Sequence, residues 1–404
     1  MTSRGRAVLA LGLAVYVVAW IFGSRALYPV AAGLVLAVAL AIAWVRLSLR
    51  EPEVWRHGAG RDVVEGEDVR IDLVVHRTAS VAPPTLVAEE RLGRLGERTV
   101  ELFPVRRRRH AGGYELRSVP RGRYGFQAVR LTVVDPFGLA AGSVTAEEPQ
   151  ALVVYPRLTE LARLFFEGGS RQNDGRRLLL RRPAGFELHS VRDYEQGESL
   201  RRVHWPSTAR RGRLMVKELE DAPRDEVAVL LDGDASAVVG EPPNSTFDVA
   251  VRAAGSILHA QARRGRRAVL ALNTAGRETQ TVGSEGGDWR RALELLAAAE
   301  PDARTPAFAL LEASGGAAAR SLELVVVTSR VEAPLVHRLV QRALSRRGVA
   351  VVYVEPESFA GRAARPQPEL LRLQAAGVPV AVVRRGDDLA AALAPAATQE
   401  VARA

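Results

Sequence analysis

The stretch "VAVLLDGDAS", Val227 to Ser236, decides the fold of the second half of the chain. Its apolar residues run without alternation into Asp232, the pattern of a strand buried on both faces of a parallel sheet. Four more apolar runs follow, at 268–273, 322–328, 349–355 and 378–383. Helical stretches separate them, at 247–264, 289–299, 334–347 and 367–376. The alternation predicts a three-layer α/β domain over residues 223–404.

Two long apolar runs lie near the N-terminus, Ala7 to Gly23 and Ala26 to Val45, and neither contains a charge. A hydrocarbon core needs about 20 such residues, and only a tight turn fits between the runs, so residues 1–50 are predicted to form a transmembrane helical hairpin. Four arginines flank the pair of apolar runs, Arg4, Arg6, Arg46 and Arg50, whereas only Arg25 lies in the turn between the runs. The positive-inside rule then predicts a bacterial inner-membrane protein with two spans and both termini cytoplasmic. A signal peptide is disfavoured because a second run follows at once.

Residues 51–156 alternate between apolar and polar side chains. This period predicts strands at 69–77, 85–92, 98–105 and 128–134, separated by turn residues. The turn residues are Pro83-Pro84, Gly112-Gly113 and Asp135-Pro136. Short alternating strands at this spacing predict an antiparallel β-sandwich. The basic run Arg106 to Arg109 is interpreted either as a contact to lipid phosphates or as a solvated loop.

The composition limits the possible functions. The chain has 404 residues and no cysteine, which excludes disulfides, thiolate zinc sites and cysteine nucleophiles. Its net charge is +10 and Lys217 is its only lysine, so a Walker A phosphate loop is absent and any ATPase must be a partner. We attribute the positive charge to contact with membrane lipid and not to nucleic acid, because no basic and aromatic binding signature occurs.

An arginine-rich segment, residues 157–222, joins the two modules and contains "FELHSVRDYEQGESLRRVHWPSTARRGRLMVKELE". This segment resembles the signature of the bacterial domain-of-unknown-function-58 family. The signature positions are Tyr194, Gly197, Glu198, Arg201, His204, Trp205 and Arg210. Upstream, "RGRYGF" (121–126) and "DPFGL" (135–139) look like other recurrent phrases of the family. The chain departs from the family's Pro-Gly-Asp-Asp turn, where it has Gln-Gly-Glu-Ser at 196–199.

The resemblance implies a fold and partners, not a reaction. The C-terminal portion of the family is similar to the von Willebrand factor A-type fold, and its members are commonly associated with MoxR-type AAA+ ATPases and transglutaminase-like membrane proteins. The resemblance therefore implies a non-enzymatic adaptor that partners such an ATPase and other membrane proteins in envelope-related assembly. Without the resemblance, the arginines and carboxylates of the segment favour an inter-domain clasp over a catalytic site.

Asp232, Asp234 and Ser236 form a candidate metal site. An A-type domain holds Mg²⁺ through an Asp-x-Ser-x-Ser loop, and here Asp234 replaces the middle serine. Ser329 also stands where a later aspartate is expected. Oxygen ligands still suit Mg²⁺, so a degenerate magnesium site and a polar strand end that only caps the loop both stay open. No other cofactor is expected.

The same Asp-x-Asp pattern also begins phosphatases of the haloacid-dehalogenase type, with Asp232 as nucleophile and Asp234 as general acid. Thr328 or Ser329 would then hold the phosphate, and Asp387 with Asp388 would hold Mg²⁺. This Mg²⁺-dependent phosphatase is the alternative to the adaptor. It is disfavoured because no lysine follows Lys217 to neutralise the phosphate.

Overall fold

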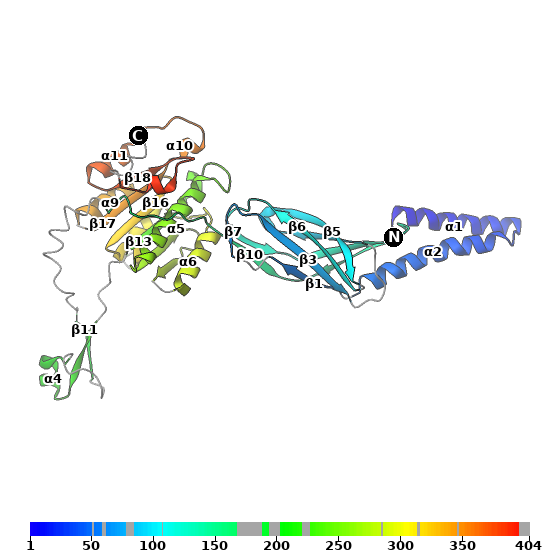
Figure 1. Cartoon of the computed structure of the whole chain (residues 1–404), viewed down its shortest axis with the longest axis horizontal. Helices are drawn as coiled ribbons and strands as arrows, with labels where there is room; N and C mark the ends of the chain where they lie inside the picture. Colours follow the sequence, from blue (N-terminus) through cyan, green and yellow to red (C-terminus); the bar gives the residue numbers. More distant parts are fainter. Residues whose placement is uncertain are drawn as a thin grey trace. The chain divides into compact units, whose positions relative to one another are not determined.

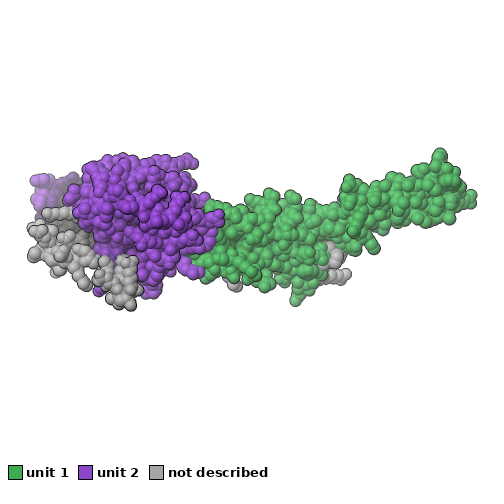
Figure 2. Space-filling model, turned by 90° about the horizontal axis from the view of Figure 1, so that it is seen from above, with its two compact units in different colours: residues 1–155 green, residues 156–404 purple. Residues whose placement is uncertain are grey.

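The computed structural model divides into two compact units, residues 1–155 and 156–404 (Figure 2). The first contains two apolar helices and an antiparallel β module, and the second contains an α/β domain and a short hairpin (Figure 1). The structure describes residues 1–50, 52–58, 62–77, 85–106, 108–167, 188–193, 203–219, 227–283, 286–312, 316–345 and 347–395.

The chain begins with two helices packed as a hairpin, α1 (Ser3–Phe22) and α2 (Leu27–Ser48). Gly23 ends α1 with a left-handed backbone (φ 62°), a conformation that glycine adopts without strain. The helices approach closely at Gly12, where a Cβ would lie 3.2 Å from side-chain atoms of Leu34 and Val35. Both helices are long and apolar enough to cross a membrane, as the sequence predicted.

The strands that follow pair antiparallel, except that β2 pairs in parallel with β10. A seven-stranded sheet has the order β1-β3-β6-β5-β4-β8-β9, and a three-stranded sheet has the order β2-β10-β7. The large sheet comprises β1 (Pro52–His57), β3 (Val69–Arg77), β4 (Leu86–Arg91), β5 (Glu97–Arg106), β6 (Arg109–Leu116), β8 (Val129–Val134) and β9 (Ala141–Ala146). The small sheet comprises β2 (Val63–Val64), β7 (Gly122–Phe126) and β10 (Gln150–Tyr155), and the 3-10 turn η1 (Gly93–Leu95) connects β4 to β5. The predicted antiparallel β module is confirmed.

One predicted turn was wrong. Gly112 and Gly113 lie inside β6, not between strands. A Cβ on Gly112 would lie 2.4 Å from the carbonyl oxygen of Glu101, and one on Gly113 would lie 2.8 Å from that of Ile71. Glycine is therefore required here by the close approach of neighbouring strands, not by a change of direction.

The β module has two apolar clusters. One combines inward-facing residues of β3, β4, β5 and β8, such as Leu73 and Leu131, with Ala41 and Val45 of α2. The other combines β3 and β6 with β7 and β10 of the small sheet, through residues such as Ile71 and Leu152. The two edge strands of the large sheet, β1 and β9, also contact each other. The large sheet therefore curls around the first cluster and packs its β3–β6 region against the small sheet.

The α/β domain is built on a six-stranded sheet of order β15-β14-β13-β16-β17-β18. Its strands are β13 (Val227–Asp232), β14 (Ala268–Asn273), β15 (Thr279–Val282), β16 (Glu323–Thr328), β17 (Gly348–Val354) and β18 (Val380–Val383). All are parallel except the edge strand β15, which the sequence analysis missed. The other five strands confirm the predicted α/β sheet.

Helices cover both faces of this sheet (Figure 1). They are α5 (Thr246–Arg263), α6 (Gly286–Ala298), α7 (Ala307–Glu312), α8 (Ala317–Arg320), α9 (Ala333–Leu344), α10 (Pro356–Phe359), α11 (Pro368–Ala375) and α12 (Leu389–Ala392). Val229 and Leu231 of β13 face the cluster that contains α5 and α6, whereas Ala228 and Leu230 face the cluster that contains α9 and α11. Every residue of β13 is buried, because each of its two faces is covered.

A short antiparallel hairpin is formed by β11 (Leu188–Asp193) and β12 (Met215–Leu219), with the helix α4 (Trp205–Arg211) between them in sequence. The backbone N–H of His204 donates to the carbonyl of Met215 (2.8 Å), and the N–H of Met215 donates to the hydroxyl of Thr208 (3.1 Å). These bonds attach α4 to β12, so the two elements form one small unit.

A buried polar cluster joins five parts of the β module. The Arg56 guanidinium donates to the carboxylate of Glu90 and to the carbonyls of Glu148 and Gln127. The Tyr114 hydroxyl donates to the other carboxylate oxygen of Glu90, and burial together with this bond raises the pKa of Tyr114. The side chains of Arg56 and Glu90 are at most 1% exposed, so each charge depends on the other for solvation.

Replacement of Glu90 by alanine is expected to lower the free energy of unfolding of the β module by about 3–5 kcal/mol, because it leaves a buried guanidinium without its carboxylate. Urea unfolding of the full-length chain in detergent, followed by tryptophan fluorescence, measures the loss. The matched control is Glu97→Ala, which removes the exposed Arg91–Glu97 pair and should cost less than about 1 kcal/mol. Equal losses in the two variants would contradict a special role for the buried pair.

Candidate functional site

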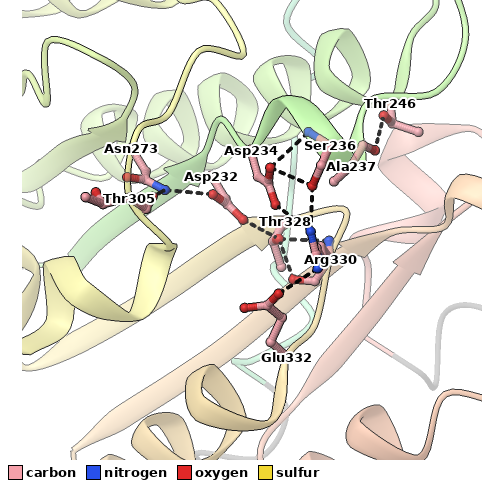
Figure 3. Close-up of polar contacts among 10 residues, drawn as sticks. All are labelled: Asp232, Asp234, Ser236, Ala237, Thr246, Asn273, Thr305, Thr328, Arg330 and Glu332. Carbon is pink, nitrogen blue, oxygen red and sulfur yellow. Dashed lines mark hydrogen bonds and ion pairs between the residues drawn. The ribbon is translucent and has the colours of Figure 1, made fainter.

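The candidate site lies where the chain changes direction across the α/β sheet. From β13 the chain crosses through α5 to β14 on one side, and from β16 it crosses through α9 to β17 on the other. The carboxyl ends of β13 and β16 therefore meet at a topological switch point, the usual ligand position in doubly wound sheets. Asp232 ends β13 and Thr328 ends β16, so both side chains lie at this point (Figure 3).

Asp232 is enclosed by polar neighbours. Its side chain accepts a hydrogen bond at Oδ1 from the Asn273 amide (2.9 Å) and at Oδ2 from the Thr328 hydroxyl (2.8 Å). The residue is only 9% exposed. Burial raises the pKa of Asp232, although the bonds from Asn273 and Thr328 act in the opposite direction. The neutral carboxylic acid is therefore favoured relative to an aspartate in water.

The hydroxyl of Thr328 shows why a protonated Asp232 suits this position. Thr328 Oγ1 lies 2.8 Å from Asp232 Oδ2 and 2.8 Å from the carbonyl of Arg330, and it accepts a bond from the Arg330 N–H (3.0 Å). A hydroxyl has one proton and can donate to only one of the two oxygens. A protonated Asp232 can donate to Thr328 itself, which leaves the threonine proton for the Arg330 carbonyl.

Arg330 closes the loop that follows β13 (Figure 3). Asp234 Oδ1 accepts from the backbone N–H (2.9 Å) and the hydroxyl (2.8 Å) of Ser236, at the 3-10 turn η4 (Ala235–Ala237). The Arg330 guanidinium lies 3.3 Å from Asp234 Oδ2, donates to the Ser236 hydroxyl (2.5 Å) and pairs with Glu332 (2.9 Å). Burial opposes ionisation of Asp234, but the Ser236 bonds and the Arg330 charge together hold its pKa below the ordinary value.

The three predicted metal ligands lie at the end of β13 and on the loop that follows it, but their arrangement does not fit a divalent cation. The guanidinium of Arg330 contacts both Asp234 and Ser236, and both oxygens of Asp232 already have hydrogen-bond partners. Among the residues that the structure describes, no three His, Cys, Asp or Glu side chains gather as a metal-binding group. The guanidinium of Arg330 therefore takes the position beside these side chains that a cation would need.

Asp387 and Asp388, the predicted Mg²⁺ ligands of the phosphatase alternative, are distant from Asp232. Asp387 accepts from the N–H of Arg384 (2.9 Å), and Asp388 caps α12 by accepting from Ala390 (3.1 Å). Both follow β18, which is three strand positions from β13. At about 4.8 Å per strand, these positions are separated by about 14 Å. Their carboxylates serve as turn and helix caps.

The signature residues lie apart from this loop in the chain. His204 precedes α4, and its ring Nδ1 lies 2.7 Å from the Ser207 hydroxyl. Trp205 is 65% exposed, and Arg210 lies exposed in the last turn of α4. The other signature positions, Tyr194, Gly197, Glu198 and Arg201, lie outside the described residues.

Sequence reasoning missed three members of the site, Asn273, Arg330 and Glu332. Asn273 had a recognisable signal, because it ends the apolar run "AVLALN" and the carboxyl ends of parallel strands share one edge. Arg330 stands two residues after Thr328 and Glu332 two residues later, just before α9. Nothing in their spacing shows that they reach across to the loop after β13.

The fold and the site define a chain with two apolar N-terminal helices, an antiparallel β module and a doubly wound α/β domain whose switch-point loop is closed by an arginine. Residues 190–359 match the family model described as "Protein of unknown function DUF58". These residues are less than half of the chain, and over them the chain is similar to the domain-of-unknown-function-58 family, in agreement with the resemblance of its arginine-rich segment.

One relative and one solved structure add to this comparison. The uncharacterized protein YeaD of Bacillus subtilis (strain 168) is 28% identical over 239 residues, which span 58% of this chain and 58% of the relative. The chain thus matches less than two thirds of that relative's length. Cwp6 from Clostridium difficile aligns over 75% of this chain and 37% of its own, with 9% identity and a TM-score of 0.17. A TM-score this low supports no argument about the fold.

The variant Asp232→Asn is expected to unfold at a higher temperature than the wild type at pH 7. Because folding raises the pKa of Asp232, the stability linked to its protonated form is present below the ordinary pKa of 3.8 and is lost as the pH rises. The gain in the variant should therefore shrink as the pH falls to 4. Calorimetry of the full-length chain at both pH values measures this difference.

Asp234→Asn is the matched control, with the opposite sign. Folding lowers the pKa of Asp234, so its stabilising effect is present above the ordinary pKa and is lost as the pH falls through the lowered value. This variant should unfold at a lower temperature than the wild type at pH 7. A loss of stability in Asp232→Asn that equals the loss in Asp234→Asn would contradict the desolvation argument.

The variant Arg330→Ala is expected to gain weak, saturable Mg²⁺ binding, with a dissociation constant on the order of 10⁻³ M. The substitution frees the oxygens of Asp234 and Ser236, which are suitable ligands for this ion. Isothermal titration of the full-length chain in detergent measures the binding. Arg338→Ala, which removes another arginine of an ion pair in the same domain, should gain none. Wild-type binding equal to that of Arg330→Ala would show that the guanidinium does not exclude the ion.

Proposed function

We propose that the chain is an interaction protein of the bacterial cytoplasmic membrane, anchored by α1 and α2, with both termini in the cytoplasm. The outward-facing side chains of the helices support the anchor, since residues such as Leu11, Ile21 and Leu36 are more than half exposed and apolar. The distribution of arginines supports the orientation, because they concentrate at the outer ends of the hairpin.

The α/β domain is the module that recognises the partner in this proposal. Its doubly wound sheet and the Asp-Gly-Asp-Ala-Ser loop after β13 support a von Willebrand A-type character. Domains of this architecture bind ligands at the carboxyl ends of their strands, where Asp234, Arg330 and Glu332 form a partly exposed charged surface. By the family resemblance, the partner is a MoxR-type AAA+ ATPase, in envelope-related assembly.

The observation that favours binding over catalysis is the closed state of the switch-point loop. A phosphatase of the haloacid-dehalogenase type needs an ionised Asp232 that can attack phosphorus. Here burial raises the pKa of Asp232, while Asn273 and Thr328 occupy its two oxygens. Arg330 is already shared among Asp234, Ser236 and Glu332. The groups that the phosphatase alternative needs are thus engaged with one another.

The adaptor proposal predicts saturable binding between the full-length chain in lipid nanodiscs and a purified MoxR-type AAA+ ATPase. Arg330→Ala removes the guanidinium from the charged surface at the switch point. This variant is expected to weaken binding about tenfold, or about 1.4 kcal/mol. Arg338→Ala, an exposed ion-paired arginine away from the loop, should leave the affinity unchanged. Biolayer interferometry measures both affinities, and a failure of the wild type to bind would sink the proposed partner.

The same preparations test the enzymatic alternative. Hydrolysis of p-nitrophenyl phosphate with 5 mM Mg²⁺, about five times the dissociation constant expected of a weak site, should not exceed the background rate. Mg²⁺-dependent turnover that disappears in Asp232→Asn would replace the adaptor proposal with the phosphatase. Turnover that survives in this variant would indicate a contaminating enzyme.

A further inference from the structure

The start of α1 is bonded directly to the β module. The N–H of Thr2 donates to the carbonyl of Leu139 (3.1 Å), and the Thr2 hydroxyl donates to the carbonyl of Gly138 (2.6 Å). Gly5, in the first turn of α1, lies so close to Leu139 that a Cβ would meet its carbonyl oxygen at 2.0 Å. The turn between β8 and β9 therefore lies at the level where α1 begins.

The last turns of α2 are also part of the module. Ala41 and Val45 are at most 7% exposed and belong to the apolar cluster of the large sheet. Gly142 of β9 lies against Val45, since a Cβ there would be 2.7 Å from its side chain. Only about 14 residues of α2, Leu27 to Leu40, precede this contact, and at 1.5 Å per residue they span about 21 Å.

These lengths place the end of the module at the membrane surface. A hydrocarbon core is about 30 Å thick, and only about 21 Å of α2 precedes its contact with the β module. The last several ångströms of the core therefore lie beside the last turns of α2 and the part of the β module that packs on them. On α1, the uncharged run begins at Ala7, about 7 Å along the helix from Thr2. The turn bonded to Thr2 then lies at the depth of the lipid headgroups.

The side chains at this end of the module suit that depth. Phe137, next to Gly138, is 79% exposed, and Phe103 and Val105 on β5 are more than half exposed. Arg106 and Arg108, at the turn between β5 and β6, are exposed as well. The strand register brings this turn beside β1, which starts four residues after α2 ends: β6 Arg109 pairs with His76, and His76 pairs with Glu53. Apolar and aromatic groups beside arginines are typical of membrane interfaces.

We propose that this end of the β module is a lipid-binding surface, in which Phe137 inserts at the interface and Arg106 and Arg108 contact the phosphates of anionic lipids. The surface consists of Phe103, Val105, Arg106, Arg108 and Phe137. The inference rests on the proposed anchor, because it takes α1 and α2 as membrane spans. It adds a second, peripheral contact that fixes the module against the bilayer.

The absence of cysteine permits a direct test with single spin labels. Three full-length variants are reconstituted into vesicles of phosphatidylcholine and phosphatidylglycerol. They are Phe137→Cys on the surface, Arg94→Cys in η1 at the opposite end of β4, and Leu36→Cys on the exposed side of α2. Collision of each label with oxygen and with a water-soluble nickel complex reports its depth. The label at 137 should meet the nickel complex several-fold less often than the label at 94.

The label at position 36 distinguishes a failure of the lipid-binding surface from a failure of the membrane anchor. A label at 36 in hydrocarbon with equal nickel accessibility at 137 and 94 overturns the lipid-binding surface and leaves the anchor intact. A label at 36 that is open to nickel overturns the anchor, and the surface with it. Addition of Arg106→Gln and Arg108→Gln to the 137 variant should raise its nickel accessibility in anionic vesicles but not in pure phosphatidylcholine. Equal accessibility with and without these arginines would overturn their assignment to anionic headgroups.

Discussion

The burial of β13 on both faces is the constraint on which the α/β domain depends. All six of its residues are buried, and their side chains alternate between the two apolar clusters. A strand enclosed in this way can expose polar chemistry only at its end, so Asp232 emerges where water has little access. A carboxyl group there needs hydrogen-bond partners or protonation, and Asn273 and Thr328 supply the partners. The candidate site thus follows from the way the sheet is covered.

The sequence predicts the parts of the fold in which one physical signal dominates. The apolar run of β13 was placed to the residue, because a strand covered on both faces requires uniform hydrophobicity. β15 was missed because its Thr-Gln-Thr-Val sequence belongs to an edge strand, only its last residue being buried. Gly112 and Gly113 were taken for a turn because glycine suits both a change of direction and a close approach of strands. Composition does not separate these two uses, and only the neighbouring backbone in the folded sheet decides between them.

The candidate site was likewise predicted only where a single physical signal dominates. The rule that polar groups gather at strand ends found Asp232 and Asp234, since each follows an apolar run in the sequence. The rule identifies where side chains emerge but not how they pair across 96 positions of the chain, as Arg330 pairs with Asp234. The metal hypothesis rested on the likeness of this loop to the Asp-x-Ser-x-Ser loop of A-type domains, in which Mg²⁺ offsets the negative charge of the ligands. The chain meets that electrostatic need with a guanidinium, which also provides directional donors to Ser236 and Glu332.

The first unit shows what such local contacts would mean for the proposed membrane anchor. An anchor joined by a flexible linker leaves its soluble part free to rotate. Here Thr2 bonds to the turn between β8 and β9, and Val45 packs in the core of the large sheet, so both helices are built into the module. Two attachment points, at the first residues of α1 and the last turns of α2, restrict rotation about either one. Where the helices span a membrane, as proposed, they set the orientation of the β module as well as its location, and they keep the same edge strands and turns facing the bilayer.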